Sequence, residues 1–191
     1  ASALGRAFAL TGDEAWAEEL RAQLLDWIEK NPYAGSCNWK NAMEVGLRAV
    51  GWIVGLELCA GSRVLADPEL VLEVHRQLHL AARFIERNLE VHGRVTGNHF
   101  LADAVGLLAI AHALPASEEV LAWRELAGSL VLREKDVQVR EDGVDYENAV
   151  GYHRLVFELL LVAHLRLKRS GSLAAGELLP TLERMLDYVL A

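Results

Sequence analysis

Apolar residues recur at three- and four-residue spacing along most of the chain, which is the pattern of helices with one buried face. In the segment Asp13–Lys30, for example, Trp16, Leu20, Leu24 and Trp27 follow this spacing. Stretches that alternate polar and apolar residues between tight turns, as strands do, are almost absent. The chain is therefore predicted to be all-α. Seven helices are expected, over Asp13–Lys30, Asn38–Ala60, Asp67–His92, Asn98–Leu114, Ser117–Val137, Glu147–Arg169 and Ala174–Leu190.

Several of these helices begin with residues that favour a helix start. Asp13 precedes the first helix and can cap its free backbone N–H groups. Pro68 lies in the first turn of the third helix, where its missing N–H costs nothing. Glu118 and Glu119 lie in the first turn of the fifth helix, where negative side chains interact favourably with the helix dipole.

The predicted helices are of two kinds. The first, third and fifth have one charged face, whereas the second, fourth and sixth are apolar almost all round and should be covered on both sides. Because the two kinds alternate, we expect an inner and an outer layer of antiparallel helices. The inner helices also begin alike, with asparagine and small residues at intervals of about 50 to 60 residues, which is typical of helical solenoids and toroids.

Composition and charge exclude several classes of protein. The sequence is 52% hydrophobic and 24% charged, unlike a disordered chain, and its net charge of −8 without a basic stripe argues against a nucleic-acid partner. The most apolar stretches, Phe100–Leu114 and Leu155–Leu165, are interrupted by polar residues and fall short of the ~18 residues of a membrane span. Cys37 and Cys59, if both lie on one helix, are separated by ~33 Å and cannot form a disulfide.

Polar residues gather at the start of the second predicted helix, which is otherwise apolar. Asn41, Glu44 and Arg48 lie within its first turns. Glu44 and Arg48 are four residues apart and fit an intrahelical salt bridge as well as a ligand contact. Trp39 offers a ring that could stack on a sugar, whereas core packing is the better interpretation for Trp52.

Two further polar groups lie at the starts of the other inner helices. Asn98 has the position of a helix N-cap, and with His99 it forms an amide–imidazole pair that could donate hydrogen bonds to a carboxylate. Tyr152 and His153 follow the start of the sixth helix. A tyrosine at such a position is usually part of the core. As a base it would have to lose its proton, which a nearby cation such as Arg48 or a protonated histidine would favour.

The sequence predicts no metal or cofactor site in this chain. His75 and His79 are four residues apart, but they lie on a helix assigned to the outer layer, where a solvated face is the simpler interpretation. Glycine-rich nucleotide loops and the Gly-x-Ser-x-Gly nucleophile motif are absent from the sequence.

Three segments together resemble a known family. The runs 38–49, 97–102 and 142–153 are similar to the N-terminal α/α-toroid of the heparinase II/III-like polysaccharide lyases, with the Asn-His and Tyr-His pairs 54 residues apart. The resemblance covers roughly Asp13 onward. It implies an incomplete (α/α) toroid of alternating inner and outer antiparallel helices, with residues 1–191 forming a single domain.

The resemblance also implies a reaction, β-elimination at a uronic acid. Asn98 and His99 would neutralise the substrate carboxylate so that the C5 proton becomes acidic, and Tyr152 would transfer a proton to or from the glycosidic oxygen. The residues expected to position the sugar are Arg48, Trp39, Asn41, Glu44 and His153.

The family resemblance places further catalytic groups outside this sequence. Such enzymes continue into a β-sandwich domain that supplies histidines and often a structural metal, and no such domain is visible here. The sequence does not begin with methionine, so we expect it to be part of a longer chain. The implied partner is an acidic polysaccharide or oligosaccharide, in a periplasmic or secreted setting, and the isolated chain is expected to be inactive.

Two other functions fit the same sequence. A toroidal glycoside hydrolase would need two carboxyl groups ~5 to 9.5 Å apart in one cleft, chosen among Asp103, Asp142, Asp145 and Glu147. A helical-repeat interaction scaffold would need no chemistry at all, and it predicts that Asn98, His99 and Tyr152 are unrelated in space.

Overall fold

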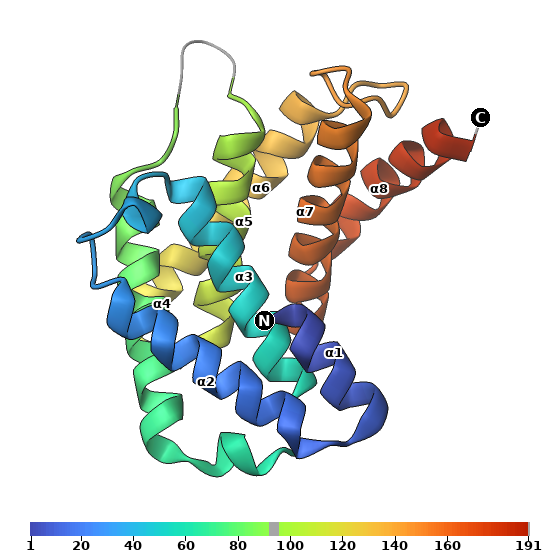
Figure 1. Cartoon of the computed structure of the whole chain (residues 1–191). Helices are drawn as coiled ribbons and strands as arrows, with labels where there is room; N and C mark the ends of the chain where they lie inside the picture. Colours follow the sequence, from blue (N-terminus) through green and yellow to red (C-terminus); the bar gives the residue numbers. More distant parts are fainter. Residues whose placement is uncertain (92–95, 191) are drawn as a thin grey trace.

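The computed structural model describes residues 1–91 and 96–190, and it is helical over most of them (Figure 1). Within these residues the β-type contact is a single isolated bridge between Val139 and Asp145. In the same part of the chain, each helix is too short or too polar to cross a membrane. The α-helices are α1 (Ser2–Thr11), α2 (Glu14–Lys30), α3 (Ala42–Leu58), α4 (Pro68–Arg87), α5 (Asn98–Ala113), α6 (Glu118–Gln138), α7 (Val150–Arg169) and α8 (Ala175–Leu190), with short 3₁₀ turns at Cys37–Trp39 and Arg63–Ala66.

All seven predicted helices are present, and α1 is an additional one. The capping predictions are confirmed: Asp13 Oδ1 accepts a hydrogen bond from the backbone N–H of Ala15 at 3.0 Å, and Pro68 is at the start of α4. The prediction that α4 extends to His92 is wrong in part, because α4 ends at Arg87, and His92 itself lies outside the described residues.

Two inner helices begin later than predicted. Asn41 has extended backbone angles, so α3 starts at Ala42 and the preceding residues form a separate 3₁₀ turn. Cys37 therefore lies outside α3, and both it and Cys59 are free thiols. The start of α7 is delayed to Val150 by a loop in which Asn148 has a positive φ of 55°.

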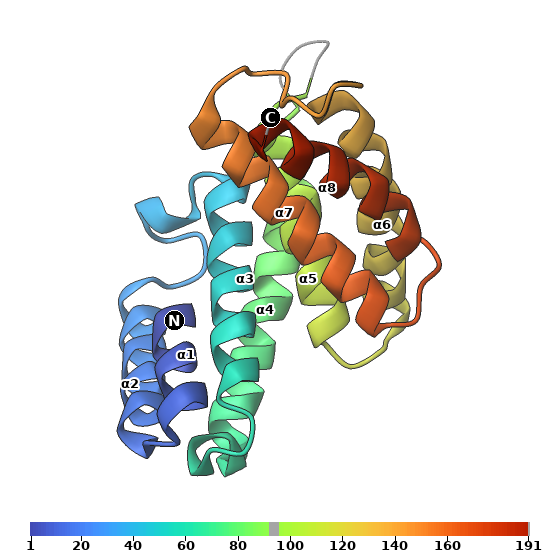
Figure 2. The same cartoon turned by 90° about the vertical axis from the view of Figure 1, so that its right-hand side faces the viewer.

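The helices form two layers that curve around an arc. Helices α3, α5 and α7 run side by side with their N-terminal ends at the same end of the molecule, at the top in Figures 1 and 2. Each packs against an antiparallel neighbour on the outside: α3 against α4, α5 against α6, and α7 against α8. Helix α1 packs on α2 and α3 at one end of the arc. The chain is thus an incomplete α/α toroid.

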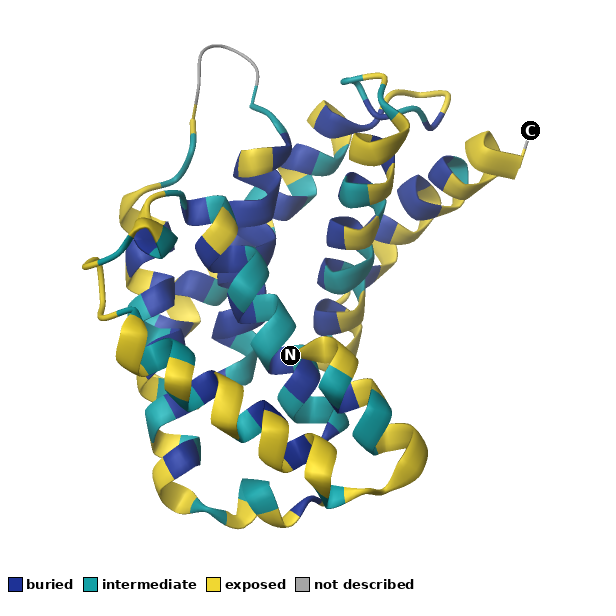
Figure 3. Ribbon diagram, viewed as in Figure 1, coloured by how far each residue is buried: buried dark blue, intermediate teal, exposed yellow. Residues whose placement is uncertain are grey.

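Burial differs sharply among the inner helices. Thirteen of the 16 residues of α5 are buried, but only seven of the 20 residues of α7 are (Figure 3). Helix α3, with six of its 17 residues buried, resembles α7. The prediction that all three inner helices are covered on both sides is therefore right for α5 and wrong for α3 and α7. The reason is position: α5 packs against α3, α4, α6 and α7, whereas α3 and α7 lie on either side of it in the inner layer.

A close backbone contact fixes α3 against α5. A Cβ atom on Gly106 would lie 2.5 Å from the Cα of Gly46, a distance that only glycine at both positions avoids. The two helices therefore approach without intervening side chains. This contact fixes the N-terminal halves of α3 and α5 against each other, and the first turn of α5 carries Asn98 and His99.

Candidate functional site

Asn98 is the first residue of α5, and its side chain joins α5 to the loop before α7. Gly97 is the N-cap, so the interpretation of Asn98 as an N-cap is wrong. Its amide nitrogen Nδ2 donates to Glu147 Oε1 at 2.6 Å, and its backbone N–H points at the same oxygen at 3.4 Å. Asn98 is only 5% exposed. The N-terminal ends of α5 and α7 are thus connected by a direct polar contact.

His99 is held by a second carboxylate, that of Glu90. His99 Nδ1 lies 2.9 Å from Glu90 Oε2, and because a carboxylate only accepts, Nδ1 carries the hydrogen. The other oxygen of Glu90 accepts the backbone N–H of Met43 at 2.9 Å, in the first turn of α3. Glu90 therefore caps α3 and orients His99 at once, which explains why Asn41 makes no capping hydrogen bond with its own side chain.

Beneath Glu90 lies a carboxyl group that is closed off from solvent. Asp103 is fully buried, and its Oδ2 accepts the backbone N–H of Glu90 at 2.7 Å. Burial raises the pKa of Asp103 from 3.8 to about 7, and the nearby negative charge of Glu90 acts in the same direction. Asp103 thus supports the backbone of the residue that orients His99.

Replacing Asp103 with asparagine is expected to make stability less dependent on pH. The folded protein binds this proton more tightly than the unfolded chain does, so the wild-type free energy of unfolding falls as pH rises from about 4 to about 7. Over that range, Asp103 lowers the free energy of unfolding by at most about 4 kcal/mol. The neutral asparagine should lack this slope. Urea denaturation at about pH 5 and about pH 8 measures it, with Asp187→Asn, at an exposed position of α8, as the control. An unchanged slope in Asp103→Asn would contradict the assignment.

Tyr152 and His153 face different surroundings on the first turn of α7. The Tyr152 side chain is 47% exposed, whereas His153 is buried. His153 Nε2 donates to the carbonyl of Met185 at 3.1 Å, and its Nδ1 accepts from the N–H of Asp145 at 3.4 Å. Both ring nitrogens are engaged within the fold, so His153 joins α7 to α8, and we do not place it among the sugar-binding residues of the site.

Arg48 lies on the opposite side of α3 from α5. Gly46 faces α5, and Arg48, two residues later on the helix, points away from it. Its guanidinium stacks over Trp27 at 4.2 Å and Trp39 at 5.2 Å and donates to the carbonyl of Asn38 at 3.0 Å. Burial lowers the pKa of Arg48 to about 10. The structure thus places Arg48 in a cluster with Trp27 and Trp39, on the side of α3 that faces away from α5.

The other residues of this group belong to the same aromatic cluster or to solvent. The Trp39 ring packs against the rings of Trp27, Tyr33 and Phe84, and its indole N–H donates to the carbonyl of Asn31 at 3.1 Å, so its ring is closed to a sugar. Glu44 is exposed and raises the pKa of Arg48 through its charge alone. Trp52 packs edge-on against Trp27, as the core interpretation predicts.

The four carboxylates of the hydrolase alternative are either buried or already hydrogen-bonded within the fold, which is unfavourable for that reaction. Asp103 and Asp145 are fully buried, and burial raises the pKa of Asp145 as well. Asp142 accepts the N–H of Val144 in a turn, and Glu147 is bound to Asn98. Asp142 and Glu147 are thus the pair that remains, and each already has a partner within the fold.

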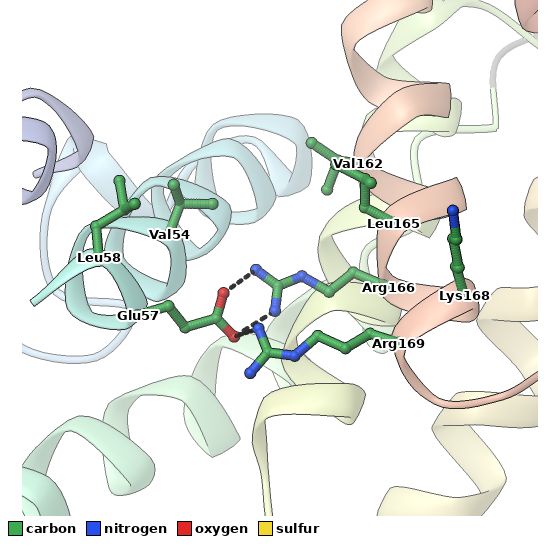
Figure 4. A pocket seen from close by; sticks show the side chains of 8 residues that line it. All are labelled: Val54, Glu57, Leu58, Val162, Leu165, Arg166, Lys168 and Arg169. Atoms are coloured by element: carbon green, nitrogen blue, oxygen red, sulfur yellow. Dashed lines mark hydrogen bonds and ion pairs between the residues drawn. The ribbon is translucent and has the colours of Figure 1, made fainter. Parts of the chain in front are cut away.

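A cavity of about 630 Å³ lies at the other end of the inner layer, between the last turns of α3 and α7 (Figure 4). Apolar residues such as Val54 and Val162 line it, and Glu57 reaches across it to Arg166 and Arg169.

In the described part of the chain, no group of three or more His, Cys, Asp or Glu side chains is arranged to hold a metal ion.

The sequence interpretation missed the two residues that hold the Asn98–His99 pair. Glu90 lies 9 residues before His99, and Glu147 lies 49 residues after Asn98. Glu90 carried no sequence signal, because it falls within a segment that was predicted as continuous helix. Glu147 belongs to a recognised motif, but its spacing gives no indication that it contacts Asn98.

The sequence of this chain is similar to those of known polysaccharide lyases. It is 28% identical over 172 residues to a heparin-sulfate lyase of Pedobacter heparinus, covering 87% of this chain and 25% of that protein. A heparin-sulfate lyase of Bacteroides stercoris is 29% identical over 170 residues, covering 78% of this chain and 25% of that protein. The chain thus spans about a quarter of the length of these relatives.

Solved structures show the same fold. The crystal structure of a heparan sulfate lyase from Pedobacter heparinus matches with a TM-score of 0.70 at 26% identity, over 98% of this chain and 30% of that one. A heparinase III structure matches with a TM-score of 0.72 at 25% identity, over 98% of this chain and 32% of that one. The family of heparinase II/III N-terminal domains matches residues 2–191. A match over nearly the whole chain places this protein in the heparinase II/III family, within its N-terminal domain.

Proposed function

We propose that the intact protein cleaves a uronic-acid-containing polysaccharide by β-elimination, and that this chain supplies substrate-binding and part of the catalytic groups. The observation that carries the proposal is the Asn98–His99 pair at the start of α5. Each member is held by its own carboxylate, and the pair is connected through Glu147 to the helix that bears Tyr152. A scaffold without chemistry has no need of such an arrangement.

The polar groups of this pair suit the neutralisation of a substrate carboxylate. The Asn98 amide has two N–H hydrogens, and one is used by Glu147, which leaves the second for a ligand. His99 uses Nδ1 for Glu90, and its ring is about half exposed, which leaves Nε2 to donate to an anion when the ring is protonated. Hydrogen bonds to the carboxylate stabilise the charge that develops when the C5 proton is removed.

Tyr152 is the proposed proton-transfer group. In β-elimination a base removes the C5 proton, a C4=C5 double bond forms as the C4–O4 bond breaks, and the leaving glycosidic oxygen takes up a proton from an acid. Tyr152 is about half exposed, so its hydroxyl can give or take that proton without rearrangement of the core. We propose that the remaining catalytic groups come from a β-sandwich domain elsewhere in the full-length protein, which acts on acidic polysaccharide outside the cytoplasm.

The test is a near-ultraviolet absorbance assay of the full-length protein on heparan sulfate and on other uronic-acid-containing polysaccharides. A lyase produces a conjugated, unsaturated uronate that absorbs, whereas a hydrolase releases reducing ends without new absorbance. We expect absorbance to rise with the full-length protein, and negligible turnover with weak oligosaccharide binding by residues 1–191 alone. New reducing ends without absorbance would contradict the lyase proposal.

A further inference from the structure

The contact between Glu147 and Asn98 determines the orientation of the Asn98 side-chain amide, that is, on which side its Nδ2 and its Oδ1 lie. Glu147 Oε1 lies 2.6 Å from Nδ2 and 3.4 Å from the backbone nitrogen of the same residue. A carboxylate accepts hydrogen bonds and cannot donate them, so an amide rotated by 180° would place its own oxygen against that of Glu147. The carboxylate therefore selects one of the two amide orientations.

Nothing else within the described residues fixes this amide. Asn98 is 5% exposed, and its Oδ1 is buried without a hydrogen-bond partner among those residues. A buried amide with one unsatisfied oxygen has little reason to keep its orientation unless a strong acceptor holds the other end. Hydrogen bonds to an ionised acceptor are about twice as strong as neutral ones. Glu147 is that acceptor.

Glu147 is itself part of a hydrogen-bonded loop between α6 and α7. The backbone N–H of Glu147 donates to Asp145 Oδ2 at 3.2 Å, and the N–H of Tyr146 donates to the carbonyl of Gln138 at 2.9 Å. Gly143 lets this loop lie against α8, because its φ is +87° and a Cβ there would lie 2.2 Å from the carbonyl oxygen of Arg184. The carboxylate is thus presented from a fixed backbone.

We propose that Glu147 is a positioning residue: it orients the Asn98 amide so that one N–H is directed at the substrate carboxylate. The inference rests on the proposed lyase function and deepens it. Glu147 lies five residues before Tyr152, so the same entry into α7 carries the group that orients Asn98 and the group that transfers the proton. The position of this one loop thereby affects both the neutralisation of the substrate carboxylate and the proton transfer.

The kinetic test uses the full-length enzyme and a double-mutant cycle. Glu147→Ala should lower kcat roughly 10- to 100-fold with little change in KM, because a misdirected donor loses its effect mainly in the transition state. In an Asn98→Ala background the same substitution should cost nothing further. Glu147→Gln should fall between, since glutamine can accept from Asn98 but also presents an N–H. Glu141→Ala, at an exposed position of the same loop, is the control and should be neutral.

Losses that add independently in the double variant, or a Glu147→Ala enzyme with wild-type kcat, would overturn the proposal. A second readout does not need turnover: selective ¹⁵N-asparagine labelling of the full-length protein. We expect Glu147→Gln to shift the Asn98 side-chain amide resonances and Glu141→Ala to leave them in place. If the wild-type enzyme forms no unsaturated product, the proposed function fails, and the resonances alone decide whether Glu147 orients Asn98. Unshifted resonances would then overturn the inference.

Discussion

Tyr152→Phe in the full-length protein is expected to lower turnover by about 10²- to 10⁴-fold while leaving substrate binding largely unchanged. The substitution removes the hydroxyl that the proposed mechanism uses for proton transfer and keeps the ring, and general acid–base groups typically contribute rate factors of this size. Because the side chain is 47% exposed and on the first turn of α7, its hydroxyl can be removed without opening a cavity in the core. Initial rates by near-ultraviolet absorbance, with binding measured by calorimetry, separate the two effects.

A matched control for this variant is Tyr33→Phe. Tyr33 is 40% exposed, close to the exposure of Tyr152, but it lies between α2 and α3 in contact with Trp39. Its hydroxyl has no role in the proposed reaction, so the variant should keep wild-type turnover. Near wild-type turnover in Tyr152→Phe would show that the proton-transfer assignment is wrong.

Asn98→Ala in the full-length protein should lower turnover as well, because it weakens the stabilisation of the enolate-like intermediate.

Glu57→Ala is expected to destabilise the fold by about 3 kcal/mol. Glu57 receives a two-pronged ion pair from Arg166, at 2.5 and 2.8 Å, and a further contact from Arg169 at 3.1 Å. The Arg166 side chain is only 9% exposed. Removing Glu57 leaves that guanidinium almost buried without its counter-charge, which costs far more than losing a surface pair.

The matched control is Arg169→Gln, which removes the exposed partner of the same glutamate. The Arg169 side chain is 71% exposed, so the expected loss is no more than about 1 kcal/mol. Urea denaturation of both variants measures the difference in the free energy of unfolding. Equal losses would show that burial of Arg166 does not decide the energetics at this end of α3 and α7.

Much of the secondary structure was predictable because it depends on local spacing. A helix places residues three and four apart on one face, so the apolar periodicity located α2, α4 and α6 and distinguished them from the apolar inner helices. Capping is equally local, and Asp13 and Pro68 mark helix starts as predicted. Two of the errors, the late starts of α3 and α7, occur where Asn41 and Asn148 have non-helical backbone angles.

The candidate site was predictable only in part. Asn98, His99 and Tyr152 stood out because polar residues at the starts of apolar helices require an explanation, and the Asn98–Glu147 contact now links the starts of α5 and α7. The surroundings of Arg48 could not be predicted, for a definite reason. Its position shows which helix face it occupies, but not that Trp27 and Trp39 cover that face.

The sequence by itself determined the all-α class, the alternation of helix types and the helix starts at which the chemistry is expected, because each depends on residues close together in the chain. Only the tertiary structure decided that α5 is covered all round while α7 is not, and that Glu90 and Glu147 hold His99 and Asn98. Helical periodicity defines a face without naming its neighbour. The contacts of Glu90 with Met43 and of Glu147 with Asn98 span 47 and 49 residues, and they arise only when the layers pack. Here Gly46 and Gly106 bring α3 and α5 together.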